Sequence, residues 1–406
     1  MTPRLLLLTT YPLVAPRHGG QVRAQALANT YQRAGFEVLT LAVVEKGAFS
    51  RHELGPRDVE FPADDPRWFF GGRRTPGTVD LQSGQFARTE PTFGAISTAL
   101  PERLDVIHLE QPFLLPLALR LMEEPRFSKS LLVYGSQNIE APLREAQLRA
   151  APPETRSKVT EQLAALEAAS CKAAPLSLAV SPADQQALYA LGAREVALAP
   201  NGVQPWSAAP AVVELWKRRL GVRAVALFVA SAHPPNIDGF EHAFGDALGC
   251  VPPDCRVVVA GSAGPVLAAR YARSRFKSLN ASRLVATGPL RDEDLSALKE
   301  LASVFLLPIF EGGGSNIKTA EALTSGRAVI ATTTSLRGFE SYRQLTGLTV
   351  ADTPQAFRRA VSSALTQPPT PLALTRELRA KLTWEDCLSS VPVEVSRRLS
   401  AKASPQ

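Results

Sequence analysis

The sequence predicts an α/β protein in which two doubly wound, Rossmann-like domains follow one another along the chain. Its 406 residues exceed the length at which a single hydrophobic core usually stops growing, so two domains are expected. Short apolar runs alternate with amphipathic stretches in both halves, which is typical of parallel sheets covered by helices. The content of 45% hydrophobic and 20% charged residues is that of an ordinary globular protein.

Each half of the chain contributes its own set of strands and helices. In the N-terminal half the expected strands are 5–9, 37–44, 105–109, 130–134 and 176–180. In the C-terminal half they are 224–231, 256–260, 283–286, 304–308 and 328–332. Helices are expected near 20–34, 144–173 with a proline interruption, 237–249, 292–301, 317–325 and 384–401. Residues 46–95 are rich in glycine, proline and charge, which predicts an irregular insertion.

Turn-forming residues divide the chain. Pro200-Asn201-Gly202 ends the first domain, predicted as 1–202, and a polar, proline-containing linker is expected at 203–222. The second domain is predicted as 223–383, followed by a helix and tail at 384–406. In tandem doubly wound domains a ligand binds at the carboxyl ends of the strands, so function is expected in loops that follow strands.

The net charge of +7 is unevenly distributed. Residues 1–200 carry 21 basic and 21 acidic side chains, which leaves 24 basic and 17 acidic for residues 201–406. A basic second half suits an anionic ligand such as a nucleoside diphosphate, although a basic solvated surface gives the same count. Basic residues cluster at 270–277, but no nucleic-acid-binding motif accompanies them, so no nucleic-acid partner is expected.

The four cysteines show no paired spacing, so neither a metal site nor a disulfide framework is expected and a cytoplasmic location fits. The leucine run at 5–8 is followed by polar and turn-forming residues, and a buried strand explains it better than a signal peptide. No apolar run reaches the roughly 18 residues needed to span a bilayer. Membrane contact, if it occurs, is expected to be peripheral, at the inner face.

The strongest local pattern is a glycine loop between an expected strand and an expected helix. Three glycines allow close approach to a phosphate, and they are Gly312, Gly313 and Gly314. Ser315 or Asn316 can cap the helix, whose first N–H groups favour an anion. Lys318 adds a positive charge, and Glu321 can accept hydrogen bonds from ribose hydroxyls. The alternative is a capped helix with a surface Lys–Glu pair.

Residues 308–323 resemble the signature of glycosyltransferase family 4, P-x-x-x-G-G-G-[ST]-x-x-K-x-x-E-A-L, and 326–332 continue it as G-x-x-V-I-A-T. Shorter similarities occur in order along nearly the whole chain, at 11–20, 105–108, 136–140, 200–203, 228–236, 288–290 and 384–385. The resemblance implies a GT-B fold, with the two domains facing each other across a cleft and the C-terminal helix returning to the N-terminal domain.

The same resemblance implies a retaining glycosyltransferase that moves a sugar from a UDP or GDP sugar to a hydroxyl acceptor. It implies no metal and no further cofactor. The expected setting is glycan, polysaccharide or glycolipid assembly, and a glycan, a lipid-linked compound or a small molecule are all open as the acceptor. The first domain is expected on the acceptor side and the second is expected to bind the nucleotide sugar.

The resemblance also assigns roles to residues. Lys318 is implied to face the diphosphate and Glu321 to bind the ribose, while the turn at Gly19 and Gly20 approaches the phosphates. The turn alone is also compatible with a tight connection between a strand and a helix. The expected donor-binding residues are Gly19, Gly20, His233, Gly261, Leu290, Gly313, Gly314, Ser315, Asn316, Lys318 and Glu321.

The chain departs from the common family pattern at two positions. Eight residues before Glu321 the family usually has a second glutamate, but here the residue is Gly313. Either Glu311 substitutes for it, or backbone amides of 312–315 hold the sugar. Where relatives often have a histidine, this chain has Gln137, which can donate to a sugar hydroxyl but cannot serve as a general base. The candidate catalytic residues are therefore Lys318, Glu311 and Gln137.

His233 follows the first strand of the second domain, where relatives often use Arg and Lys, and it is expected either to contact phosphate or to be exposed. Asn236 is expected to cap the next helix. Two rival functions stay open. A nucleotide-sugar epimerase of similar fold would need acid and base groups that the sequence does not show, and a non-catalytic homologue would bind the nucleotide sugar without turnover.

Overall fold

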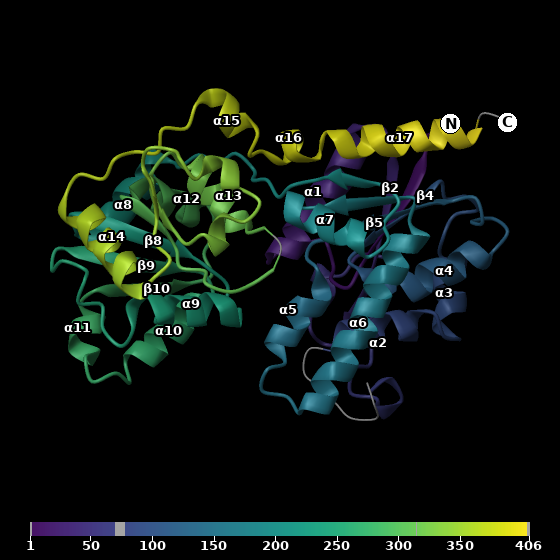
Figure 1. Cartoon of the computed structure of the whole chain (residues 1–406), viewed down its shortest axis with the longest axis horizontal. Coiled ribbons are helices and arrows are strands. Elements are labelled where there is room, and N and C mark those ends of the chain that lie inside the picture. The colour runs from purple at the N-terminus through teal and green to yellow at the C-terminus, as the bar shows by residue number, and fades with distance from the viewer. Residues whose placement is uncertain (1, 70–77, 314, 404–406) are drawn as a thin grey trace. The chain divides into compact units, whose positions relative to one another are not determined.

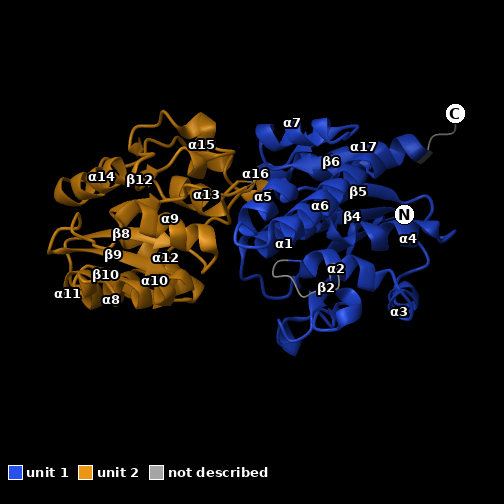
Figure 2. Cartoon of the chain, turned by 60° about the horizontal axis from the view of Figure 1, so that its bottom comes forward, with its two compact units in different colours: residues 1–200, 387–406 blue, residues 201–386 orange. Residues whose placement is uncertain are grey.

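The computed structural model describes residues 2–69, 78–313 and 315–403 (Figure 1). The chain forms two compact units, shown in different colours in Figure 2. Unit 1 consists of Met1–Pro200 and Cys387–Gln406, and unit 2 consists of Asn201–Asp386. Each unit contains one parallel sheet covered by helices, as predicted.

Unit 1 contains the first seven strands. They are β1 (Arg4–Thr9), β2 (Glu37–Glu45), β3 (Val59–Phe61), β4 (Val106–Glu110), β5 (Leu131–Gly135), β6 (Leu176–Ala179) and β7 (Val196–Leu198). Its helices are α1 (Gly19–Arg33), α2 (Val79–Ala87), α3 (Thr92–Thr98), α4 (Leu115–Glu123), α5 (Glu140–Gln147), α6 (Pro153–Ala173), α7 (Pro182–Ala190) and α17 (Ser390–Ala403).

The sheet of unit 1 has the order β3-β2-β1-β4-β5-β6-β7, and every paired strand runs parallel to its neighbour. The four leucines of β1 are fully buried, which is why the strand reads as one continuous apolar run. The strand order reverses direction between β1 and β4. In doubly wound sheets this switch point marks the place where ligands bind, beyond the carboxyl ends of the strands.

Residues 46–95 are more regular than the sequence predicts. Their described part contains β3 and α2, and α3 begins within it. The sequence does not predict helix α2, because the helix contains Gly84 and glycine normally weakens a helix. A Cβ atom at Gly84 would lie 2.0 Å from the carbonyl oxygen of Phe113, so glycine lets the helix approach the backbone that follows β4.

Helix α17 belongs to unit 1, although it lies at the end of the chain. Arg398 forms an ion pair with Glu195, which precedes β7, and the Lys402 ammonium donates to the carbonyl of Ser130 at 3.4 Å. The predicted return of the C-terminal helix to the N-terminal domain is therefore confirmed. Helix α16 (Trp384–Leu388) spans the boundary between the two units.

Unit 2 contains the remaining strands. They are β8 (Ala224–Val229), β9 (Cys255–Ala260), β10 (Leu284–Gly288), β11 (Val304–Leu307), β12 (Ala328–Ala331) and β13 (Leu348–Val350). Its helices are α8 (Pro210–Leu220), α9 (Pro234–Phe244), α10 (Ala263–Tyr271), α11 (Lys277–Ala281), α12 (Asp292–Leu301), α13 (Ile317–Thr324), α14 (Pro354–Thr366) and α15 (Arg376–Ala380).

The sheet of unit 2 has the order β10-β9-β8-β11-β12-β13, again with parallel pairing, and its switch point lies between β8 and β11. Residues 203–222, expected as a linker, contain α8, which packs in unit 2. Trp216 of α8 is 4% exposed and donates its indole N–H to Asp294 of α12 at 3.0 Å. Within the described ranges, no helix combines the length and the apolar character needed to cross a bilayer.

Candidate functional site

The glycine loop of unit 2 connects β11 to α13 at the carboxyl end of the strand, beside the switch point. The segment predicted to continue the signature supports it. The Thr332 hydroxyl donates to the carbonyl of Ile309, and the Thr334 hydroxyl donates to the carbonyl of Phe310 at 3.3 Å. The backbone of the loop is thereby held by residues that follow the neighbouring strand β12.

The far side of the loop is held from two directions. Arg337 donates to the carbonyl of Gly312 at 2.7 Å. The Asn201 amide donates to the carbonyl and to the hydroxyl of Ser315, at 3.0 and 2.9 Å. Ser315 therefore anchors the loop and does not act as the helix cap. Gly313 is half-buried, and Gly314, a predicted donor-binding residue, lies outside the described residues.

Asn316 occupies the N-cap position of α13, but its side chain makes no capping hydrogen bond. The expectation that a side chain of Ser315 or Asn316 caps this helix is therefore wrong. The side chain of Asn316 does not satisfy the first N–H groups of α13, and such groups carry the positive end of the helix dipole. This is the arrangement expected where a helix start receives an anion.

Lys318 lies in the first turn of α13, and its ammonium group donates to the side-chain oxygen of Asn236. Asn236 is held in turn because its amide donates to the carbonyl of Ser231 at 2.9 Å. Asn236 thus positions Lys318, and the expectation that it caps α9 is wrong, since His233 occupies that N-cap. Burial lowers the pKa of Lys318 to about 8, against the opposing effect of the Glu321 carboxylate.

His233 lies in the loop that follows β8, on the other side of the switch point from β11. His233 is exposed as a residue, but its ring is partly buried. This burial, followed by the nearby charge of Lys318, lowers the pKa of His233 below its usual value. A histidine and a lysine close enough to affect each other electrostatically lie together here. The loop after β8 and the start of α13 therefore lie together at the carboxyl end of the sheet, where Lys318 supplies the positive charge.

Glu321 lies one turn further along α13 and is not paired with Lys318. Its Oε1 atom lies 3.1 Å from the ammonium of Lys299, at the end of α12. Lys299 is nearly buried, and its ammonium also lies 5.5 Å from the ring centroid of Trp206. Lys299 could not be singled out from the sequence, because a lysine in the last turn of a helix is ordinary. The carboxylate predicted to bind ribose is held in place by this lysine.

Glu311 is exposed at the beginning of the loop. Gly261 and Leu290 follow β9 and β10. The backbone of Gly261 is left-handed, with a φ angle of 104°, and a Cβ atom there would lie 2.3 Å from the carbonyl of Ala230. Its N–H donates to the carbonyl of Gly288 at 2.8 Å, which joins the two loops. Leu290 is half-buried beside them.

In unit 1, Gly19 and Gly20 form the start of α1, which follows β1 at the switch point. His18 is the N-cap, and its ring nitrogen accepts from the N–H of Gln21 at 3.4 Å. A Cβ atom at Gly20 would lie 2.8 Å from the Gln137 side-chain oxygen and 3.1 Å from the Tyr11 hydroxyl. The glycine therefore has a packing function, because it lets α1 approach the residue that follows β5.

Gln137 is 9% exposed and is held by other side chains of unit 1. Its amide nitrogen donates to the Tyr11 hydroxyl and to Oε2 of Glu110, both at 2.5 Å. It also lies 3.4 Å from the carbonyl of Gly20. The structure thus brings Gln137 and the glycine turn together, at the ends of β1, β4 and β5.

A buried polar cluster that sequence reasoning missed lies beneath this turn. Glu110 and Arg23 are almost fully buried, and their closest side-chain atoms are 3.7 Å apart. His108 lies 3.6 Å from Glu110, and its other ring nitrogen is 3.0 Å from the Tyr31 hydroxyl. Polar residues at the carboxyl end of a buried strand, here His108 and Glu110 on β4, were the available signal.

Comparison with known proteins agrees with this fold. Residues 223–367 match the family model of glycosyl transferases group 1. No curated protein matches the chain. A sucrose-phosphate synthase from Thermosynechococcus elongatus has a similar structure, with a TM-score of 0.67 and 14% identity, covering 99% of this chain and 100% of that one.

Two further similar structures contain ligands. The catalytic domain of starch synthase IV from Arabidopsis thaliana, bound to ADP and acarbose, has a TM-score of 0.64 and 12% identity, covering 100% of both chains. HepE from Anabaena, in complex with UDP-glucose, has a TM-score of 0.55 and 15% identity, covering 98% of this chain and 99% of that one. The chain has the GT-B fold of these structures, and the residues that match the family model make up most of unit 2.

Proposed function

We propose that this protein is a retaining glycosyltransferase that moves a sugar from a nucleoside-diphosphate sugar, of the UDP or GDP type, to a hydroxyl acceptor. The observation that carries the proposal is the placement of Lys318 at the uncapped start of α13, beside His233 and one turn before Glu321. At one switch point, the cation and the helix start can bind the phosphate groups of a nucleoside diphosphate, and the carboxylate can bind the hydroxyl groups of its ribose.

The reaction breaks the bond between the anomeric carbon and the diphosphate, so negative charge develops on phosphate oxygens. Lys318 and the backbone N–H groups at the start of α13 are fixed before the substrate arrives, and such preorganised groups stabilise developing charge without reorganisation. We assign Oε2 of Glu321 to the ribose hydroxyls, because Lys299 holds Oε1. We propose front-face attack by the acceptor hydroxyl, with no metal ion required.

The remaining predicted residues take roles consistent with this scheme. Glu311 is proposed to contact the transferred sugar, in place of the glutamate that the family has at the position of Gly313. In unit 1, Gln137 and the turn at Gly19 and Gly20 are proposed substrate contacts. Gln137 donates its amide N–H groups to Tyr11 and Glu110, so its side-chain oxygen is the atom proposed to accept from a substrate hydroxyl, and the residue is not a base.

The acceptor is proposed to be a glycan, a lipid-linked compound or a small molecule with a free hydroxyl, in polysaccharide or glycolipid assembly. A cytoplasmic location, with peripheral contact at the inner face of a membrane, is consistent with that role. Support comes from the similar structures, which bind UDP-glucose in one case and ADP with acarbose in the other.

The test is incubation with a panel of UDP and GDP sugars, with release of free nucleoside diphosphate as the readout. Lys318→Ala is expected to lower turnover about 100-fold, the scale for losing one preorganised charge contact. Lys217→Ala is the matched control, because Lys217 is an exposed lysine of α8 paired only with Glu214. Equal turnover in the two variants would contradict the role of Lys318.

The glycine at position 313 favours one alternative, a homologue that binds a nucleotide sugar without transferring it. The same panel separates these functions. Release of the diphosphate supports transfer, whereas saturable binding without release supports the non-catalytic alternative. Conversion of the donor to an epimeric nucleotide sugar would identify an epimerase.

A further inference from the structure

Unit 2 contains a surface cavity of about 620 Å³ that the proposed function does not use. We call it the basic cavity, and its lining includes Asp246, Arg275, Phe276, Arg358, Arg359 and Ser362. Such a volume suits a small organic ligand. Parts of the lining precede β9 and α11, on the connections that lead into β9 and β10, whereas the loops proposed for the donor follow β8 to β11. The cavity therefore lies toward the amino ends of these strands, whereas the proposed donor site lies at the carboxyl ends of the strands.

Three arginines from two separate segments meet at this cavity. Arg358 is positioned by donating to the carbonyl of Ala243, at the end of α9, at 3.0 Å. The Arg275 guanidinium lies 4.7 Å from the ring centroid of Phe276, and Arg359 is exposed on α14. Within the described part of the chain, none of the three arginines forms an ion pair with a carboxylate.

One neighbouring arginine, Arg270, behaves differently from the three at the cavity. Arg270, on α10, pairs with Glu241 and lies 3.8 Å from Asp238, so its charge is balanced within unit 2. The cavity contains one carboxylate, Asp246, against three guanidinium groups. The lining is thus strongly cationic, and Asp246 can accept a hydrogen bond from a hydroxyl group. The other lining residues include Phe244, Ala247, Gly249 and Cys250, which are uncharged. The Cys250 thiol stays neutral because burial raises its pKa to about 11.

We propose that the basic cavity binds a phosphate group carried on a small hydroxyl-bearing body. Guanidinium groups match the geometry of phosphate oxygens and can bind them in pairs of hydrogen bonds. Asp246 accepts from a hydroxyl of the ligand, and the half-exposed Phe276 covers its apolar part. A phosphorylated polyol or sugar in solution and a glycerophosphate headgroup of a lipid share this chemistry.

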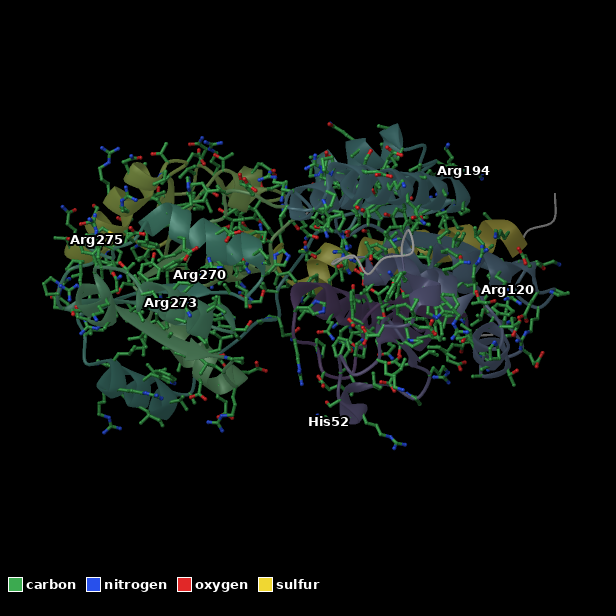
Figure 3. All side chains as sticks on the ribbon, turned by 90° about the horizontal axis from the view of Figure 1, so that it is seen from below. His52, Arg120, Arg194, Arg270, Arg273 and Arg275 are labelled. Carbon is green, nitrogen blue, oxygen red and sulfur yellow. The ribbon has the colours of Figure 1, made fainter. Side chains whose placement is uncertain are left out.

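Arg273 provides a matched control. It lies two residues before Arg275 in the same basic segment, and both are labelled in Figure 3. Arg273 is exposed like Arg275 but does not line the cavity. Arg273→Gln therefore removes the same charge from nearly the same place as Arg275→Gln. Arg359→Gln removes a cavity arginine from a different helix. Arg358 is left unchanged because it holds the end of α9.

The first arm of the experiment titrates the full chain with glycerol 3-phosphate by calorimetry. Losing one guanidinium contact to phosphate is expected to weaken binding about tenfold in Arg275→Gln and in Arg359→Gln. Arg273→Gln is expected to stay within about twofold of the unchanged protein, because Arg273 does not line the cavity and the effect of its exposed charge is screened by salt. The second arm measures sedimentation with phosphatidylcholine vesicles, with and without phosphatidylglycerol, for the same four proteins.

Binding of glycerol 3-phosphate with this variant pattern identifies a soluble phosphate ester as the ligand. Binding only to vesicles that contain phosphatidylglycerol, with the same pattern, identifies the lipid headgroup. An equal loss in Arg273→Gln shows a diffuse charge effect and overturns the proposal. Failure of both probes to bind also overturns it. Neither outcome bears on the donor site, since all three arginines lie outside it.

Discussion

The Oε1 atom of Glu321 lies 3.1 Å from the Lys299 ammonium, so the carboxylate proposed to bind ribose is oriented by a lysine from another helix. Glu321→Gln is expected to weaken nucleoside-diphosphate binding about tenfold or more, through loss of charge-assisted hydrogen bonds. Lys299→Met should weaken it less, because the carboxylate stays but loses its orientation. Calorimetry with the free diphosphate measures both.

The double variant Lys299→Met with Glu321→Gln distinguishes positioning from direct contact. If Lys299 acts through Glu321, removing it in the Glu321→Gln background costs little further affinity, so the two effects are not additive. Fully additive losses would show that Lys299 contributes independently. Circular dichroism of each variant checks that α12 and α13 stay folded.

Lys318 has a pKa of about 8, so ligand binding is expected to depend on pH. The folded chain holds Lys318 neutral above pH 8, whereas the unfolded chain keeps an ordinary lysine charged to about pH 10. An arriving diphosphate favours the cation, so binding above pH 8 should take up a proton and weaken as the pH rises. Calorimetry at pH 8.5, in buffers that differ in ionisation enthalpy, counts the proton.

Lys318→Met is expected to abolish this proton uptake. Burial of the ring lowers the pKa of His233 below its usual value, so any proton uptake by His233 occurs at more acidic pH than uptake by Lys318 and is removed by His233→Gln. Undiminished uptake at pH 8.5 in Lys318→Met would contradict the assignment of the lowered pKa to the ligand-binding lysine.

Glu311→Gln tests whether this residue replaces the family glutamate. If Glu311 contacts the transferred sugar, the variant should bind the free diphosphate normally but turn over the sugar donor more slowly, by about tenfold or more. Initial rates of diphosphate release and calorimetry with the free diphosphate provide the two readouts. Unchanged donor binding and turnover would exclude a sugar-binding role for Glu311 and leave the backbone of 312–315 as the candidate.

Gly20→Ala tests the close approach between α1 and Gln137. Alanine normally stabilises a helix, but here its Cβ would lie 2.8 Å from the Gln137 side-chain oxygen. Gln137 must then move, so turnover is expected to fall although the helix itself is favoured. Gln137→Asn, with a shorter side chain, should tolerate Gly20→Ala with a smaller further loss; an equal loss in both backgrounds would exclude this steric explanation.

The fold was predictable because both sheets consist of buried parallel strands, which read as continuous apolar runs such as that of β1. The sequence does not predict the short edge strands β3, β7 and β13, since three residues give no periodic signal. The glycine loop was predictable from local composition. Contacts between residues distant in sequence leave no local pattern. The sequence therefore predicts Asn236 as a helix cap and does not single out Lys299. A hydrogen bond from Lys318 to a residue 82 positions away has no local signature.

The buried Arg23 of α1 donates to the carbonyl of Ala199, at 2.8 Å, just before the polypeptide leaves unit 1 at Pro200. The same side chain approaches Glu110, the residue that also accepts from Gln137. One arginine thus fastens both the turn that carries Gly20 and the segment through which the chain departs. Replacing Arg23 would therefore disturb two places together: the proposed substrate contacts at Gly20 and Gln137, and the segment through which the chain leaves unit 1. Neither can be altered alone through Arg23.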